Sequence, residues 1–359
     1  MMSRTVTLQQ RLDEMTAPAA EALVEVLDAD EGKLRCLACG HRCVLKEGRR
    51  GICKVRFNQG GTLRVPRGYV GALQVDPVEK KPFFHVLPGS NVLSFGMLGC
   101  DFRCSYCQNW DISQTLRDEA AGRDFIPISA DELVELGRRY RSRAVASTYN
   151  EPLITTEWAV EVFQKARAAG MLTMYVSNGN GTREVIEYLK PWINAYKIDL
   201  KTMQDRHYRR ELGGVLQNVL DTIRWVYEAG IWLEVLTLVI PGFNDSNEEL
   251  YDAARYIAGI SPDIPWHVTA FHPDYKMMDP PPTSAAMLIR AAEIGAEAGL
   301  HYVYAGNLPG RCGEWEDTRC PSCGTTLIAR TGYMITLNRL SDTGGRCPEC
   351  GTAIPGVWQ

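Results

Sequence analysis

The chain has 359 residues, 45% of them apolar, with a formal charge of −4 and a pI near 5.9. This length exceeds that of a typical single domain, so one large domain with appended modules, or two or three domains, is expected. The acidic balance argues against a nucleic-acid surface, and the most apolar stretch, residues 231–240, is too short to span a bilayer.

Twelve cysteines dominate the composition, and the first ten residues lack the apolar core of a secretory signal peptide. In a reducing compartment, clustered cysteines bind metal more often than they form disulfides. We therefore expect a cytoplasmic protein with thiolate metal sites. The cysteines fall into three groups, and Cys312, which we interpret as incidental, is left over.

The N-terminal region begins with apolar residues spaced along one helical face over 8–29, which predicts a helix that Pro18 breaks or kinks. Short strands are expected at 62–64 and 69–75. A C-x2-C-x3-C-x9-C pattern lies between this helix and these strands. It predicts one metal site, holding either zinc or an auxiliary iron–sulfur cluster. Its cysteines are Cys36, Cys39, Cys43 and Cys53.

The second group has the spacing C-x3-C-x2-C, at Cys100, Cys104 and Cys107. Three thiolates can hold three irons of a cubane cluster and leave the fourth open to a small molecule. The alternative, three ligands of a structural zinc site, fits the motifs further along the chain less well.

The middle of the chain, from residue 92 to 304, alternates short apolar runs with helical stretches. Repeated strand–helix units predict a parallel sheet with helices outside, and six or seven units indicate a partial barrel. Ser129 and Ser246 begin capping boxes. The expected strands are 92–98, 144–148, 172–176, 193–200, 232–240, 266–271 and 301–304.

Polar motifs follow these apolar runs, where the carboxyl ends of parallel strands place ligands. Examples are Tyr149-Asn-Glu-Pro152, Ser177-Asn-Gly and Asp199-Leu-Lys201. Each has a plainer interpretation: a helix start, a turn and a charged strand end, respectively. His272 is equally compatible with a loop role and a substrate contact.

The last group consists of two matching Cys-Pro-x-Cys-Gly knuckles around a strand-like stretch, 325–338. Each glycine permits a tight turn behind its second thiolate. The pattern predicts a closed tetrahedral zinc ribbon that folds a tail too small for its own core; iron is the alternative. The ligands are Cys320, Cys323, Cys347 and Cys350.

The run Cys-Asp-Phe-Arg-Cys-Ser-Tyr-Cys-Gln-Asn resembles the signature of the radical S-adenosylmethionine (SAM) superfamily. Residues 92–310 are similar to the partial barrel of pyruvate formate-lyase activating enzymes. The whole chain most resembles the radical SAM proteins of the AmmeMemoRadiSam system. We thus expect an α/β fold with a partial (β/α)6-type barrel. The expected domains are 1–90 with the N-terminal metal site, 91–311 with the barrel, and 312–359 with the zinc-ribbon-like tail.

The resemblance implies that Cys100, Cys104 and Cys107 ligate a [4Fe–4S] cluster whose open iron binds SAM. Tyr149, Asn150 and Glu151 stand where the superfamily usually has two glycines and a glutamate that contact the SAM amino group. Tyr106 is expected to shield the cluster. The implied cofactor-binding residues are Tyr106, Asn150, Glu151, Pro152, Ser177, Asn178, Gly179, Asp199 and Lys201.

The resemblance also implies reductive cleavage of SAM to a 5′-deoxyadenosyl radical, which abstracts hydrogen from an unidentified small molecule or protein. Implied partners are a flavodoxin- or ferredoxin-like electron donor and Memo-like and Amme-like proteins. Two alternatives remain open: an activase for a glycyl-radical enzyme, and a non-enzymatic iron–sulfur or zinc protein with an interaction or sensory role. Nucleic-acid modification is disfavoured because no basic surface is evident.

Overall fold

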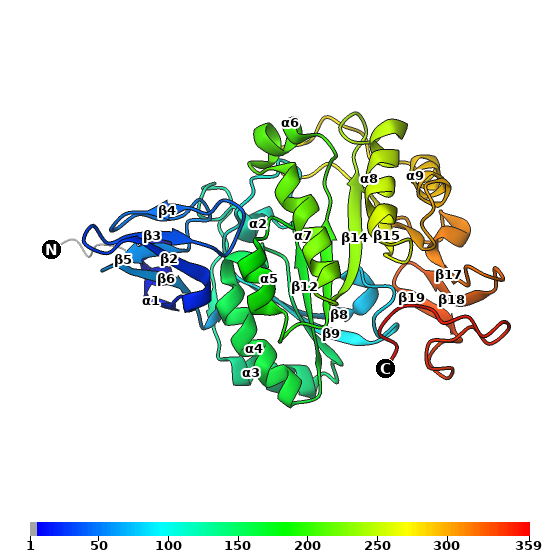
Figure 1. Ribbon diagram of the computed structural model, residues 1–359, viewed down its shortest axis with the longest axis horizontal. Coiled ribbons are helices and arrows are strands. Elements are labelled where there is room, and N and C mark those ends of the chain that lie inside the picture. The colour runs from blue at the N-terminus through cyan, green and yellow to red at the C-terminus, as the bar shows by residue number, and fades with distance from the viewer. Residues whose placement is uncertain (1–5) are drawn as a thin grey trace.

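The computed structural model describes residues 6–359. It places an N-terminal lobe of small sheets at one end, a large sheet with helices in the middle and a small C-terminal module at the other end (Figure 1). The first five residues, part of the stretch considered for a signal peptide, lie outside this description. Within residues 6–359 no helix is long and apolar enough to cross a membrane.

The central sheet has eight strands in the order β16-β15-β14-β13-β12-β11-β9-β8. Its two end strands do not pair, so the structure shows an open sheet and a barrel remains a prediction. All seven runs predicted as strands are confirmed and lie parallel, whereas β8 (Ala72–Pro77) is antiparallel to β9. The parallel strands are β9 (Asn91–Gly96), β11 (Ala144–Ser147), β12 (Leu172–Ser177), β13 (Ala195–Asp199), β14 (Trp232–Val239), β15 (Trp266–Ala270) and β16 (Val303–Gly306).

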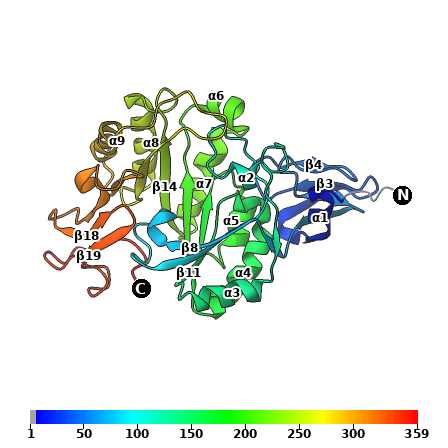
Figure 2. The same ribbon diagram turned by 180° about the vertical axis from the view of Figure 1, so that it is seen from behind.

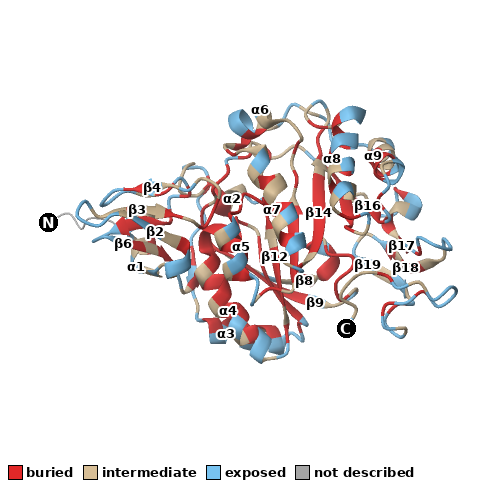
Figure 3. Ribbon diagram, in the orientation of Figure 1, coloured by how far each residue is buried: buried red, intermediate tan, exposed pale blue. Residues whose placement is uncertain are grey.

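Both faces of this sheet are buried, as the red central strands of Figure 3 show. Side chains alternate along each strand: Leu93 and Val145 join the core under the helices, while Val92 and Ala144 join a second cluster with residues of the 78–87 segment. The helices of this layer are α2 (Trp110–Ser113), α3 (Ala130–Arg139), η3 (Pro152–Thr155), α4 (Thr156–Ala168), α5 (Arg183–Leu189), α6 (Asp205–His207), η4 (Tyr208–Leu212), α7 (Leu216–Glu228), α8 (Asn247–Ile260) and α9 (Ala285–Glu297).

The two predicted capping boxes differ in outcome. At α3, Ser129 and Glu132 satisfy each other's backbone amides, as expected. At α8, Ser246 accepts from the Glu249 amide, but the Glu249 carboxylate accepts from Met203 N at 2.8 Å instead of returning to the cap. The cap forms, and its glutamate is used to hold the loop after β13.

The N-terminal lobe corrects the predicted helix over 8–29. Within it only α1 (Leu8–Glu14) is an α-helix, because Met15 leaves the helix and the chain enters β1 (Thr16–Pro18), where Pro18 is tolerated at a sheet edge. The other elements of this part are η1 (Glu21–Leu23), β2 (Val24–Asp28), β3 (Lys33–Cys36), β4 (Val44–Leu45), β5 (Phe57–Gln59), β6 (Thr62–Pro66), β7 (Tyr69–Val70), which pairs with β10 (Ile126–Pro127), and η2 (Val78–Lys80).

The C-terminal module packs beside β16 and the 83–90 segment, which the view from behind also shows (Figure 2). Phe84 lies in one cluster with Tyr304 and Leu327, so residues far apart in sequence share a core. A hydrogen-bond chain from Arg330 through Thr318 joins the module to Tyr304. Its elements are η5 (Gly313–Glu316), β17 (Thr318–Arg319), β18 (Thr326–Thr331) and β19 (Met334–Asn338).

Candidate functional site

The loop after β9 brings Cys100, Cys104 and Cys107 to one cavity of about 390 Å³. Gly99 makes this possible: its φ of +93° is left-handed, and a β-carbon there would lie 3.0 Å from the carbonyl oxygen of Cys53. Burial raises the pKa of all three thiols, that of Cys104 to about 12. Buried thiols become stable thiolates when metal cations offset the desolvation, so this donor set fits an iron–sulfur cluster.

Glu151 lines a second side of the cavity, next to the cysteine loop just described. It follows β11, and its carboxylate accepts from Ser177 Oγ at 2.7 Å, Asn178 N at 2.7 Å and Leu153 N at 3.0 Å. Burial, reinforced by nearby Asp101, raises the pKa of Glu151 to about 8. Its three bonds tie the loop after β12 to the loop after β11, so its carboxylate is already engaged.

Asp101, next to the first cysteine, joins the same loops. Its two oxygens accept from the side-chain amides of Asn178 and Asn180, both at 2.8 Å, and it is 2% exposed. His41 Nε2 lies 3.2 Å from the Asp101 carbonyl oxygen, so the N-terminal lobe touches the cysteine loop here. A buried carboxylate with two fixed donors keeps the cysteine loop in register with the loop after β12.

Charged residues at the end of β13 form the third wall. Asp199 accepts from Lys197 and, at 3.2 Å, from Lys201. Burial alone would raise the pKa of Asp199, but the two ammonium groups outweigh it and lower that pKa. Lys201 is also close enough to lower the pKa of Cys104. Because two ammonium groups share one carboxylate, the group of Lys197, Asp199 and Lys201 leaves a net positive charge beside the cysteines.

Seven of the nine residues that the resemblance implies for cofactor binding line this cavity with the three cysteines. Pro152 and Gly179 do not. Pro152 starts η3, and Gly179 needs to be glycine because its φ is +74° and a β-carbon would lie 2.6 Å from Ile198. Those that line the cavity are Tyr106, Asn150, Glu151, Ser177, Asn178, Asp199 and Lys201.

Sequence reasoning missed several residues of this cavity. Lys197 lines the cavity two residues before Asp199, and Asp101, inside the cysteine motif, holds the cysteine loop without lining the cavity; the pattern gave no sign that either side chain was used. Lys81 comes from the 78–82 segment and donates to Asp76 at 2.7 Å and Tyr149 at 3.2 Å. No signal within that segment indicates that it folds against the sheet.

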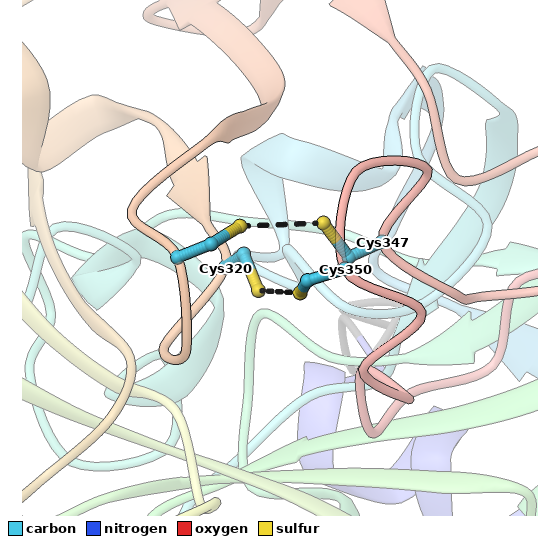
Figure 4. A group of neighbouring side chains, drawn as sticks. Cys320, Cys347 and Cys350 are labelled. Atoms are coloured by element: carbon cyan, nitrogen blue, oxygen red, sulfur yellow. Dashed lines mark hydrogen bonds between the residues drawn. The ribbon is translucent and has the colours of Figure 1, made fainter.

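The C-terminal cysteines form a compact group, as predicted (Figure 4). Their four sulfur atoms lie within 4.8 Å of one another, with Cys320 to Cys350 at 3.5 Å and Cys323 to Cys347 at 3.6 Å. A tetrahedral zinc site with Zn–S bonds of about 2.3 Å has sulfur–sulfur edges of about 3.8 Å. The donor set and its spacing fit a zinc ion.

The structure corrects the predicted N-terminal metal centre. Within residues 6–359, only the C-terminal cysteines bring their sulfur atoms within 4.8 Å of one another, the spacing that a single zinc ion needs; Cys36, Cys39, Cys43 and Cys53 do not, and neither do Cys100, Cys104 and Cys107. The zinc alternative at the N-terminus is therefore corrected, whereas the auxiliary iron–sulfur cluster, whose ligands stand further apart than those of one ion, stays a prediction. The cause is local packing. The amide of Gly40, instead of closing a knuckle behind its cysteines, donates to Asn180 O at 2.8 Å. Three of these cysteines pack in three different apolar clusters: Cys36, Cys39 and Cys53.

Comparison with known proteins agrees with this geometry. The model of the radical SAM superfamily matches residues 96–254. An uncharacterized protein of Methanocaldococcus jannaschii, MJ0808, is 39% identical over 303 residues, which cover 84% of this chain and 89% of that protein. A pyruvate formate-lyase-activating enzyme of Clostridium pasteurianum is 24% identical over 209 residues, 54% of this chain and 84% of the enzyme.

Solved structures superpose more loosely. The match to a radical SAM methyltransferase from Sphaerobacter thermophilus covers 87% of this chain and 81% of that protein, at 15% identity and a TM-score of 0.47. The sequence matches, together with the three cysteines at one cavity, place the chain in the radical SAM superfamily. Membership implies a [4Fe–4S] cluster and SAM as cofactors.

Proposed function

We propose that this protein is a radical SAM enzyme that cleaves SAM reductively and uses the resulting radical to abstract hydrogen from a substrate held in the same cavity. The observation that carries the proposal is the convergence of the three cysteines with Glu151, Ser177 and Asn178 on one cavity. A reduced [4Fe–4S] cluster with bound SAM supplies a 5′-deoxyadenosyl radical in enzymes of this superfamily.

The chain's own residues would hold and shield this chemistry. Cys100, Cys104 and Cys107 would ligate the cluster, and buried Tyr106 would exclude water from it. Lys201, beside Cys104, would offset negative charge on the cluster and its ligands. Asn150 donates to Gly99 O at 3.1 Å and accepts from Met97 N at 3.0 Å, which fixes the cysteine loop at its root.

The proposal extends to the setting of the enzyme. A flavodoxin- or ferredoxin-like protein in the cytoplasm would reduce the cluster. The enzyme would act within the AmmeMemoRadiSam system, together with its Memo-like and Amme-like proteins. Zinc would occupy the C-terminal cysteine group. A second candidate function, activation of a glycyl-radical enzyme, draws support from the 24% identity to the Clostridium pasteurianum activating enzyme. Detection of a glycyl radical in a partner protein would favour it.

The test is electron paramagnetic resonance of anaerobically reconstituted, reduced protein with and without SAM, together with an assay for 5′-deoxyadenosine. We expect a cubane signal that changes when SAM is added, and 5′-deoxyadenosine release that requires reductant. Cys104→Ala should abolish both. Cys312→Ser is the matched control, because Cys312 is buried outside the cavity. A cubane signal that SAM leaves unchanged would favour the sensory alternative.

A further inference from the structure

A buried pair, Glu234 and His267, lies at the wall of the cavity, and neither residue has been assigned a role in holding the cluster or SAM. Glu234 is the third residue of β14, and His267 is the second residue of neighbouring β15. Their side chains are 0% and 2% exposed, and His267 Nε2 lies 2.6 Å from Glu234 Oε2. His267 lines the cavity. A carboxylate–imidazole pair at the wall of a reaction cavity has a defined hydrogen-bonding polarity, which the surroundings fix.

Glu234 is ionised. Its carboxylate accepts from the backbone amides of Phe84 and His85 and from Trp232 Nε1, each at 3.0 Å, in addition to His267. Burial alone would raise the pKa of Glu234, but the bond from His267 and the other donors lower it. A carboxylate that only accepts requires its imidazole partner to donate from Nε2.

The tautomer of His267 follows from this polarity. With its hydrogen on Nε2, the neutral ring carries a lone pair on Nδ1, and Nδ1 has no hydrogen-bond partner within residues 6–359. Burial lowers the pKa of His267, so the ring is neutral near pH 7. Phe84 packs edge-on against the ring at 4.9 Å, and Tyr304 lies at 5.2 Å, so the ring is held in place.

A second acceptor at the same cavity also lacks a partner. Glu79 is 0% exposed; one of its carboxylate oxygens accepts from Gly89 N at 2.9 Å, and the other, Oε2, has no partner. An unpaired buried acceptor is costly until a donor reaches it. The cavity's buried ammonium groups, by contrast, each bond to a carboxylate: Lys81 to Asp76, and Lys197 and Lys201 together to Asp199. The net positive charge of the last group lies beside the cysteines that would hold the cluster.

We propose that His267 Nδ1, oriented by Glu234, binds the substrate by accepting a hydrogen bond from one of its N–H or O–H groups, with Glu79 as a second acceptor. This deepens the proposed function, because it names the substrate class for the same cavity: an amine or polyol, not a carboxylate or a phosphate. N–H or O–H groups of the substrate would donate to His267 Nδ1 and Glu79 Oε2. An anionic substrate would instead be repelled by the Glu79 carboxylate and by the lone pair on His267 Nδ1.

The test uses the full-length, reconstituted protein with SAM bound and four probes: 1,4-diaminobutane, erythritol, succinate and inorganic phosphate. Isothermal titration calorimetry measures their affinities, and ¹⁵N spectra of histidine-labelled protein report the state of Nδ1. We expect the amine or the polyol to bind and to shift the His267 Nδ1 resonance, and the two anions to do neither. The responding probe distinguishes an N–H from an O–H donor.

The informative variant is His267→Gln. Its amide nitrogen can still donate to Glu234, but it leaves no acceptor at the Nδ1 position, so affinity for the donor probe should fall about tenfold, as for one lost hydrogen bond. His301→Gln, at an exposed histidine paired with Asp263, is the control and should leave affinity unchanged. Glu79→Gln, a substitution of nearly equal size, should weaken binding of the donor probe as well and serves if His267→Gln fails to fold.

Tight binding of succinate or phosphate, absence of binding by both donor probes, or donor affinity unchanged in His267→Gln and Glu79→Gln would overturn the inference. The outcome is separate from that of the proposed function, which SAM cleavage tests without any of these probes. If the protein cleaves SAM but does not bind the donor probes, the proposed function stands and the proposed substrate class is wrong.

Discussion

The N-terminal and C-terminal groups each have four cysteines, but only the C-terminal group has its four sulfur atoms within 4.8 Å of one another. At the C-terminus, Gly324 and Gly351 have φ values of +73° and +76°, and each amide donates to the carbonyl of the first cysteine of its knuckle at 2.9 Å. At the N-terminus, Gly40 bonds to the loop after β12 instead. In the C-terminal group, the closed turns bring the four sulfur atoms close together. In the N-terminal group, the turn at Gly40 packs on the loop after β12, and its cysteines do not come as close.

The largest expected effect concerns metal at the C-terminal group. Cys320→Ser should remove about one equivalent of zinc and expose the module to proteolysis, because zinc binding supplies about 10–16 kcal/mol in small zinc domains. Elemental analysis and limited trypsin digestion measure this. Cys43→Ser is the matched control at the N-terminus and should leave the zinc content unchanged. Equal loss of zinc in both variants would erase the contrast between the two groups.

The next effect concerns how the N-terminal lobe is anchored. Arg56 forms a buried pair with Glu157, with nitrogen–oxygen distances of 2.6 and 2.7 Å. Glu157→Gln leaves the guanidinium without its counter-charge and should cost about 3–5 kcal/mol in urea unfolding. Glu161→Gln breaks the exposed bidentate pair with Arg67 and should cost about 0–1 kcal/mol.

A small effect of Glu157→Gln would change the picture of the N-terminal lobe. If the loss stays under about 1 kcal/mol, Glu157 is not the main anchor of Arg56, and the apolar contacts of the lobe hold it instead.

The smallest effect concerns the attachment of the C-terminal module and depends on pH. Burial lowers the pKa of His85 to about 4. His85 accepts from Tyr304 OH at 2.6 Å and donates to Pro355 O at 2.6 Å, so it links β16 to the end of the module. An unfolded chain binds this proton below about pH 6.5. Stability should therefore be complete above that pH and fall by up to about 3 kcal/mol as the pH drops to 4.

Urea unfolding between pH 4 and 7 measures this slope, and His85→Gln should flatten it. His301→Gln, at the exposed pair with Asp263, should keep the slope of the unaltered protein. An identical slope in both variants would assign the pH dependence to other groups, of which buried His267 is the nearest in kind.

Local patterns determined much of this protein. Seven strands followed from apolar runs because a strand buried on both faces needs a continuous apolar stretch. The cysteine loop, the motifs after the strands and the C-terminal knuckles followed from spacing and from glycine at tight turns. Residues 8–29 were misjudged because their apolar spacing suits a helix, while pairing of β1 with β6 and of β2 with β3 decides otherwise.

Tertiary structure alone decided the rest. The engagement of Glu151 by two loops, the pairing of Glu234 with His267 and the separation of the N-terminal sulfur atoms each depend on residues distant in sequence. Sequence spacing carries no information on such contacts, because burial and hydrogen-bond partners exist only once the strands are assembled. The sequence by itself therefore determined the family and the cysteine loop, whereas the assembled sheet determined which buried polar groups are paired and with which partners.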